Sequence, residues 1–204
     1  EGAFWGCYNL ADVQFDSNAY LQWIGAYAFQ NCTNLNNVVW PESVKYIDTG
    51  VFADCYSLKQ ITIPDTVASI QNRAFEGCTA LTDITLPGGL TYIGSRAFNM
   101  SGIENIVIPE GLDEIRPQAF AGTALATITI PDAVRTIGYS AFEDCKNLTN
   151  ITLPNQLETI AAAAFQRCEK LENIEIPDTV TSIWNRAFEG TKVASIKLPN
   201  NLVS

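Results

Sequence analysis

The residues best suited to chemistry in this sequence are its six cysteines, which stand at Cys7, Cys32, Cys55, Cys78, Cys145 and Cys168. A cysteine thiol can ligate a metal, attack a substrate or join a disulfide. No C-x-x-C pair occurs, and the chain has no histidine. It therefore lacks the base of a Cys-His or Ser-His-Asp site and every metal site that needs an imidazole. We expect no catalytic residue, no metal site and no cofactor, and so no enzyme.

The spacing of the cysteines leaves two interpretations open. If successive repeats stack, neighbouring cysteines come within disulfide range, and the possible bridges are Cys7–Cys32, Cys55–Cys78 and Cys145–Cys168. Free thiols packed as small hydrophobic side chains account for the same spacing, and we favour them.

Two further sets of residues have a functional and an ordinary interpretation. Acidic residues after several prolines suggest a calcium column, but we interpret them as turn formers: Glu42, Asp65, Glu110, Asp132 and Asp178. Four N-x-S/T sequons suggest glycosylation, but the repeat itself favours Asn and Thr, so we interpret these as chance matches: Asn31, Asn99, Asn147 and Asn150.

The cysteines belong to a repeat that runs through the whole chain. Nine phenylalanines recur every 22 to 25 residues, from Phe4 to Phe188, and alanine precedes all of them except Phe52. Eight of the nine prolines form a second series, from Pro41 to Pro199. The unit reads L-x-x-I-x-I-P-x-x-V-x-x-I-x-x-x-A-F-x-x-C-x-x. The units after Phe98, Phe120 and Phe188 are one residue shorter and carry Ser101, Thr123 and Thr191 in place of cysteine.

A unit of 22 or 23 residues is too short to bury its own apolar face, so stacked units are expected to share one core, as in a solenoid. Apolar and polar residues alternate at the end of segment 58–63, which predicts a half-buried strand that the following proline ends. We predict a right-handed, mostly β solenoid of about nine coils. Each coil contributes one short parallel strand and little helix, and its phenylalanine ring stacks on the rings of neighbouring coils.

The unit strongly resembles the BspA-like, or treponemal-type, leucine-rich repeat, whose pattern is LxxLxLPxxLxxIGxxAFxxCxx. The Ile-Pro, Ala-Phe and Cys positions carry the resemblance over nearly the whole chain. It implies an α/β-type leucine-rich repeat solenoid. It also implies a protein secreted or held at the cell surface, with a role in adhesion or in host or cell–cell interaction.

The whole chain, residues 1–204, is predicted to form a single leucine-rich repeat domain. Residues 1–28 form an irregular first repeat, because Asp16 stands where proline belongs and two extra residues precede Phe29. Neither end carries an obvious polar cap, which solenoids need for solubility. We therefore expect a fragment of a longer array.

Composition limits the classes of partner. The net charge is −10, from 12 basic and 22 acidic residues, so the chain lacks the basic excess of nucleic-acid binders. No apolar run approaches the roughly 18 residues that span a bilayer, so we expect no membrane insertion. A protein is the expected partner, and a glycan is the second choice.

Two sets of residues are candidates for partner binding. Tyr139, Trp184 and Arg186 lie in the variable segments before Ala-Phe, where exposed aromatic and arginine side chains suit an interface hot spot. The second set faces outward from the predicted strands, on what we expect to be a concave face: Asn105, Thr127, Thr129, Asn150, Thr152 and Asn173. Loop variation and a solvated sheet face explain the same residues without a partner. In that case the chain is a structural spacer or stalk.

Overall fold

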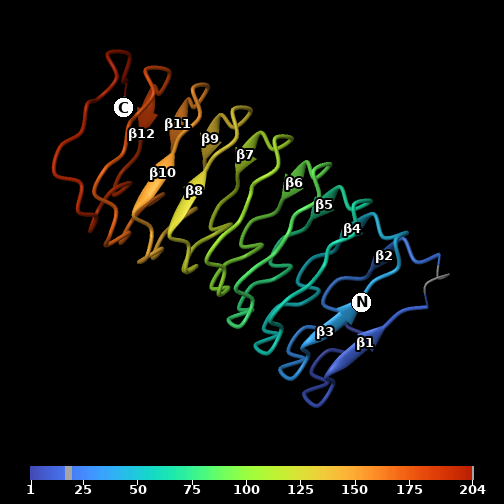
Figure 1. The fold of residues 1–204 in the computed structure, drawn as a ribbon. Helices are drawn as coiled ribbons and strands as arrows, with labels where there is room; N and C mark the ends of the chain where they lie inside the picture. Colours follow the sequence, from blue (N-terminus) through green and yellow to red (C-terminus); the bar gives the residue numbers. More distant parts are fainter. Residues whose placement is uncertain (17–19, 204) are drawn as a thin grey trace.

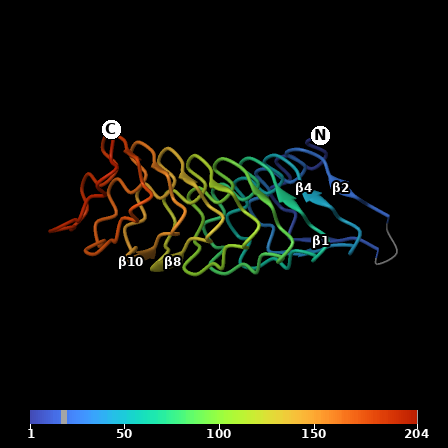
Figure 2. The ribbon, with the colours of Figure 1, turned by 90° about the horizontal axis from the view of Figure 1, so that it is seen from above.

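The structure, a computed structural model, describes residues 1–16 and 20–203, and among these it contains no helix. Each repeat forms one coil, and the coils stack along one axis (Figure 1). One side of the stack carries the three-residue strands β1 (Asp12–Gln14), β3 (Asn37–Val39), β8 (Thr127–Thr129) and β10 (Asn150–Thr152). Another side carries two-residue strands: β2 (Trp23–Ile24), β4 (Tyr46–Ile47), β5 (Ser69–Ile70), β6 (Tyr92–Ile93), β7 (Glu114–Ile115), β9 (Thr136–Ile137), β11 (Thr159–Ile160) and β12 (Ser182–Ile183). Figure 2 shows the two sets on different sides of the coils.

The strands of the first side follow from the predicted alternation. In β8 the central Ile128 is buried, and the threonines on either side of it are exposed. β8 pairs in parallel with β10, and β1 pairs in parallel with β3. The parallel strand predicted at L-x-x-I-x-I is therefore present in these four coils. The equivalent segments 60–62, 83–85 and 105–107 are joined only by isolated bridges, and 173–175 and 195–197 form no strand.

The structure adds a second strand to most coils, in the V-x-x-I segment that follows the proline turn. These strands form two parallel sheets of four, in the orders β2-β4-β5-β6 and β12-β11-β9-β7. Most of their isoleucines, such as Ile47 and Ile70, are buried, and Ile183 in the terminal strand β12 is half-buried. A return segment that must bury one residue and expose its neighbour adopts the same extended geometry as the first strand.

The phenylalanine rings form one continuous stack through the core, as predicted. Consecutive ring centroids lie 5.3 to 5.7 Å apart, and no ring is tilted more than 14° from the next. The seven rings from Phe29 to Phe165 are almost completely buried. The apolar residues of the repeat and the rings belong to one hydrophobic core.

A third backbone ladder runs along the Ala-Phe arcs, although no strand is assigned there. Phe52 donates its N–H to the carbonyl of Ala74 at 2.9 Å, and Asp54 donates to Glu76 at 2.7 Å. The arc requires a left-handed residue two positions before and two positions after each phenylalanine. Arg73 and Asp54 take these roles, with φ of 59° and 61°.

The number of coils is lower than predicted, since the structure has about seven turns instead of nine. The prediction counted every phenylalanine as a coil. However, the eight two-residue strands from β2 to β12 are separated by only seven turns of the solenoid. The segment after Phe188 forms no strand among its described residues. The irregular first repeat, residues 1–28, includes residues 17–19, which lie outside the described residues. It therefore stays a prediction.

Candidate functional site

The outward side chains of the first side form a broad surface that we call the polar face. It comprises β1, β3, β8 and β10 and the equivalent segments 60–62, 83–85, 105–107, 173–175 and 195–197. All six strand-position candidates lie exposed on it: Asn105, Thr127, Thr129, Asn150, Thr152 and Asn173. Parallel pairing sets Thr127 beside Asn150 and Thr129 beside Thr152.

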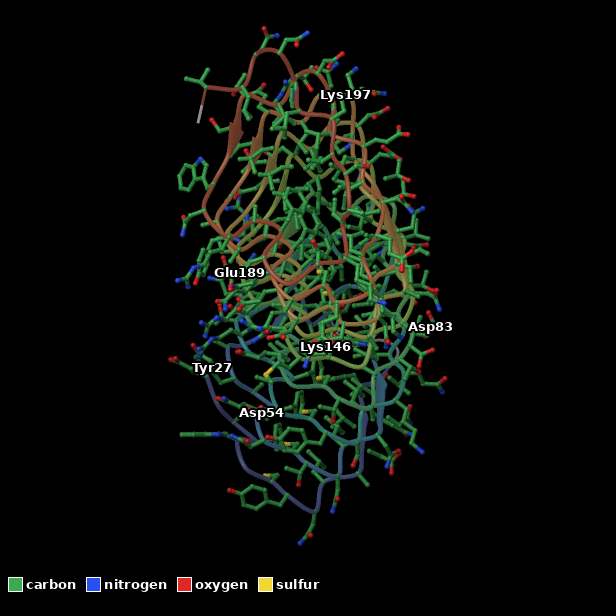
Figure 3. All side chains as sticks on the ribbon, turned by 90° about the vertical axis from the view of Figure 1, so that its left-hand side faces the viewer. Tyr27, Asp54, Asp83, Lys146, Glu189 and Lys197 are labelled. Atoms are coloured by element: carbon green, nitrogen blue, oxygen red, sulfur yellow. The ribbon has the colours of Figure 1, made fainter. Side chains whose placement is uncertain are left out.

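The other three candidates lie elsewhere. Tyr139 follows β9, and Trp184 and Arg186 follow β12, so they belong to the side of the two-residue strands. In Figure 3, Glu189, the ion-pair partner of Arg186, lies on the opposite side of the coil from Asp83 on the polar face. The structure therefore does not bring all nine predicted residues into one site.

The side chains of this second group are accessible, as expected. Tyr139 is 53% exposed and Trp184 is 55% exposed. The intervening coil carries alanines at residues 161–164, of which Ala161 and Ala163 are buried. The ion pair of Arg186 Nε with Glu189 measures 3.4 Å and is exposed, so it holds the guanidinium only weakly.

The polar face has hollows that the sequence did not reveal. The central hollow, of about 650 Å³, spans three coils and is lined by residues 83–86, 105–108, 110, 127–129 and 131. A second hollow of about 730 Å³ lies beside it, lined by residues 150–153, 155, 173–178 and 197. Val107 protrudes at the central hollow and is 84% exposed.

The central hollow lies at a coil that is poorly hydrogen-bonded to the preceding coil, residues 104–116, which we call the seam coil. Val107 and Ile108 form no hydrogen bond with the neighbouring coils. On the other side, neither Asp113 nor Arg116 donates its N–H to the preceding coil. In the next coil the equivalent bonds from Arg135 and Gly138 measure 3.0 and 2.8 Å.

The local sequence explains the missing hydrogen bonds of the seam coil. Pro117 stands outside the proline series and restricts the backbone of Arg116. Two residues after the repeat proline, Thr66 and Thr179 donate their hydroxyls to carbonyls of the preceding coil at 2.7 Å. The seam coil has Gly111 at that position and lacks this bond, but the next coil, with Ala133 there, also lacks it and is still bonded through Arg135 and Gly138. Pro117 is therefore the feature that distinguishes the seam coil. The guanidinium of Arg116 lies over the Tyr92 ring of the preceding coil, 4.6 Å from its centroid.

The cysteines are free thiols in this structure, and five are buried as we favoured. Each buried thiol donates to the phenylalanine carbonyl of the preceding coil, for example Cys78 Sγ to Phe52 O at 3.1 Å. Burial raises the pKa of the Cys145 thiol to about 11. Cys7 lies in the outermost coil and is exposed, so the predicted burial is wrong for this residue.

The titratable residues do not converge on a site. Among the described residues, no three His, Cys, Asp or Glu side chains are placed to hold a metal ion. The described part of the chain also has no helix long and apolar enough to cross a membrane.

The repeat, the stacked rings and the parallel ladders define a leucine-rich repeat solenoid. The family model for the BspA type leucine rich repeat region matches residues 1–125 and 113–204, with six copies. The chain therefore belongs to the BspA-type leucine-rich repeat family. None of the curated proteins matches it significantly.

Solved bacterial structures share the fold. A leucine-rich repeat protein from Bacteroides ovatus is 33% identical with a TM-score of 0.90, and the match covers 98% of this chain and 52% of that one. The Treponema pallidum leucine rich repeat protein is 29% identical (TM-score 0.57), with 84% of this chain and 69% of that chain covered. A leucine rich cell surface protein from Faecalibacterium prausnitzii is 28% identical (TM-score 0.55), with 98% and 70% covered. This chain thus spans about half the length of the Bacteroides ovatus protein.

Proposed function

We propose that the chain is a non-enzymatic, extracellular or cell-surface binding module that takes part in adhesion or in host or cell–cell interaction. The polar face is the main support for this proposal. Its exposed Thr and Asn side chains lie in register, because parallel pairing between coils fixes their positions. Leucine-rich repeat domains typically mediate protein interactions. A rigid array lowers the entropy cost of ordering side chains on binding.

A surface location is supported by the likeness to the Faecalibacterium prausnitzii protein, which is described as a cell surface protein. A protein is the partner that we propose first, and a glycan is the second choice. Enzyme activity has little support, because no described cluster of titratable groups resembles a catalytic site.

The binding test separates the two candidate surfaces. The chain is titrated onto immobilised extracellular-matrix proteins and onto epithelial cells, and binding is measured by biolayer interferometry and flow cytometry. One variant carries Thr127→Glu and Thr152→Glu on the polar face, and its matched control carries Tyr139→Ala and Trp184→Ala on the other side. Saturable binding that only one variant weakens assigns the surface, and no saturable binding on any target contradicts the proposal.

The alternative is a spacer or stalk in a larger surface protein, which the continuous ring stack and arc ladder favour because they make a stiff rod. A spacer predicts that both double variants behave as wild type in a full-length parent protein. Deletion of one whole repeat would then be the only change with an effect.

A further inference from the structure

The central hollow differs from the rest of the polar face in its apolar content. Val107 protrudes there with 84% of its surface exposed, and the half-buried Leu86 and Ile106 also line the hollow. The remaining lining is mostly hydroxyl, amide and carboxylate. A single exposed apolar side chain is ordinary on a protein surface, so the significance of Val107 comes from Leu86 and Ile106, which line the same hollow inside a polar rim.

Its charge is one-sided. Asp83 and Glu110 line the hollow, no lysine or arginine does, and neither carboxylate forms an ion pair in the described part of the chain. The second hollow, in contrast, has Lys197 beside its two acids, Glu175 and Asp178. Charge complementarity therefore points to a basic partner at the central hollow.

The register places Val107 between the two carboxylates along the chain direction of the coil. Asp83 pairs with Asn105, Val107 follows two residues later, and Glu110 follows three after that. At about 3.3 Å per residue, Val107 lies about 7 Å along the strand from Asn105. Glu110 lies beyond it in the turn that follows Pro109, so the strand rise sets only an upper limit of about 16 Å for its distance along the same direction. In an extended peptide, every second side chain points the same way, about 7 Å from the last. The long side chains of lysine and arginine can extend over the remaining distance to the Glu110 carboxylate.

We propose that the central hollow binds an extended segment of a partner protein in which two basic side chains flank an apolar one at alternate positions. The apolar side chain contacts Val107, and the two cationic groups pair with Asp83 and Glu110. The seam coil supports this choice of site. Val107 and Ile108 form no hydrogen bonds with neighbouring coils, so a small shift of their backbone on binding would break none. The inference rests on the proposed binding function and names the chemistry of its partner.

A short peptide tests the proposal directly. The probe is acetyl-Arg-Ser-Leu-Ser-Arg-amide, and the controls replace both arginines by glutamate or the leucine by serine. Titration into the isotope-labelled chain is followed by NMR at the Val107 methyl groups. We expect saturable shifts with the probe, at least about tenfold weaker binding with either control, and weakening as ionic strength rises.

Paired variants locate the contact. Asp83→Asn with Glu110→Gln is expected to weaken binding of the probe by about tenfold. The matched control, Glu175→Gln with Asp178→Asn, neutralises two acids of the second hollow and is expected to leave binding unchanged. Equal weakening by both pairs, equal binding of the glutamate peptide, or no saturable shift at Val107 would overturn the proposal. If the chain binds cells or matrix proteins while the Asp83 and Glu110 variants have no effect, the binding function stands and this site does not.

Discussion

At the scale of single residues, the phenylalanine stack is the strongest structural element of the repeat. Phe75 is fully buried, and its ring lies 5.5 Å from the rings of Phe52 and Phe98. Its replacement removes apolar burial and two ring contacts at once, and leaves a cavity that rigid backbone ladders on all sides cannot close.

Phe75→Ala is therefore expected to lower the free energy of unfolding by about 3–5 kcal/mol, measured by urea denaturation. Phe75→Leu should lose less, because it keeps most of the volume. Tyr56→Ala is the control, since Tyr56 is 47% exposed and its loss should cost about 0.5 kcal/mol or less. Equal losses in the Phe75→Ala and Tyr56→Ala variants would contradict the buried stack.

The thiols differ in accessibility, which alkylation can measure. Five cysteines are buried and Cys7 is exposed. Iodoacetamide at pH 8 is expected to modify Cys7 alone in the folded protein and all six cysteines in urea, as counted by mass spectrometry. Cys7→Ser should remove the fast reaction. Rapid labelling of Cys145 or Cys168 in the native state would be inconsistent with their burial.

Buried thiols also make stability depend on alkaline pH. Burial raises the pKa of Cys145 from 9.0 to about 11, so between these values the unfolded thiol ionises while the folded one keeps its proton. The raised pKa of Cys145 contributes about 2–3 kcal/mol to the free energy of unfolding. This contribution is fully present below pH 9 and is lost as the pH rises to 11. Urea unfolding at pH 8 and pH 10.5 checks it. Cys145→Ala should show a smaller difference between the two pH values, and an identical difference would refute the linkage.

At the scale of the coil, the Ala-Phe arc depends on left-handed backbone at fixed positions. Gly122 lies two residues after Phe120 with φ of +69°, and a Cβ there would meet the Met100 side chain at 3.4 Å. Gly88 lies in a turn without positive φ, and a Cβ there would meet nothing within 4 Å.

These two glycines form a matched pair. Gly122→Ala is expected to destabilise the protein by about 1–2 kcal/mol, because alanine is strained in the left-handed region. Gly88→Ala is expected to be neutral or to stabilise by up to about 1 kcal/mol, because it restricts the unfolded chain. Thermal denaturation measures the melting temperature of both variants. A melting temperature of Gly122→Ala at or above that of the wild-type protein would argue against a strained arc.

At the scale of the whole molecule, the seam coil divides the strand ladders into an N-terminal and a C-terminal group. β6 and β7 are sequence neighbours on the same side but belong to different sheets. The Ala-Phe arc continues across the division, with Phe98 N donating to Ala119 O at 2.9 Å. The two groups are therefore joined by the arc ladder and the core, while no strand pairing connects β6 to β7.

Hydrogen exchange should detect this difference. The amides of Asp113 and Arg116 are expected to exchange at least about tenfold faster than those of Arg135 and Gly138, which are hydrogen-bonded to the seam coil. NMR exchange on the wild-type chain gives the comparison. Protection of Asp113 equal to that of Arg135 would show that the seam is closed in solution.

The sequence predicted the parts of this structure that repeat, and it failed where the molecule departs from the repeat. The stacked rings, the buried thiols and the first parallel strand each follow from a residue type that recurs at a fixed interval. Positions such as Arg73 gave no signal, because their backbone is left-handed while their side chains vary from coil to coil. The position of Asp54 did carry one, because Gly, Asn or Asp stands two residues after most of the phenylalanines, but we made no prediction from it. The candidate residues were correctly expected to be exposed, and the two sets that the sequence distinguished lie on two different sides of the coils.

The amino-acid sequence by itself determined that this chain is a solenoid with a ring-stacked core, because units too short to bury an apolar face can do so only by stacking in register. Only the tertiary structure decided where the stack is weakly bonded and hollowed. Pairing between coils depends on the geometry of both neighbours together, so a single proline beside Arg116 coincides with the loss of contacts that no individual repeat contains. For the same reason, the protruding Val107 and the two unpaired acids came into view as one surface only in the folded stack.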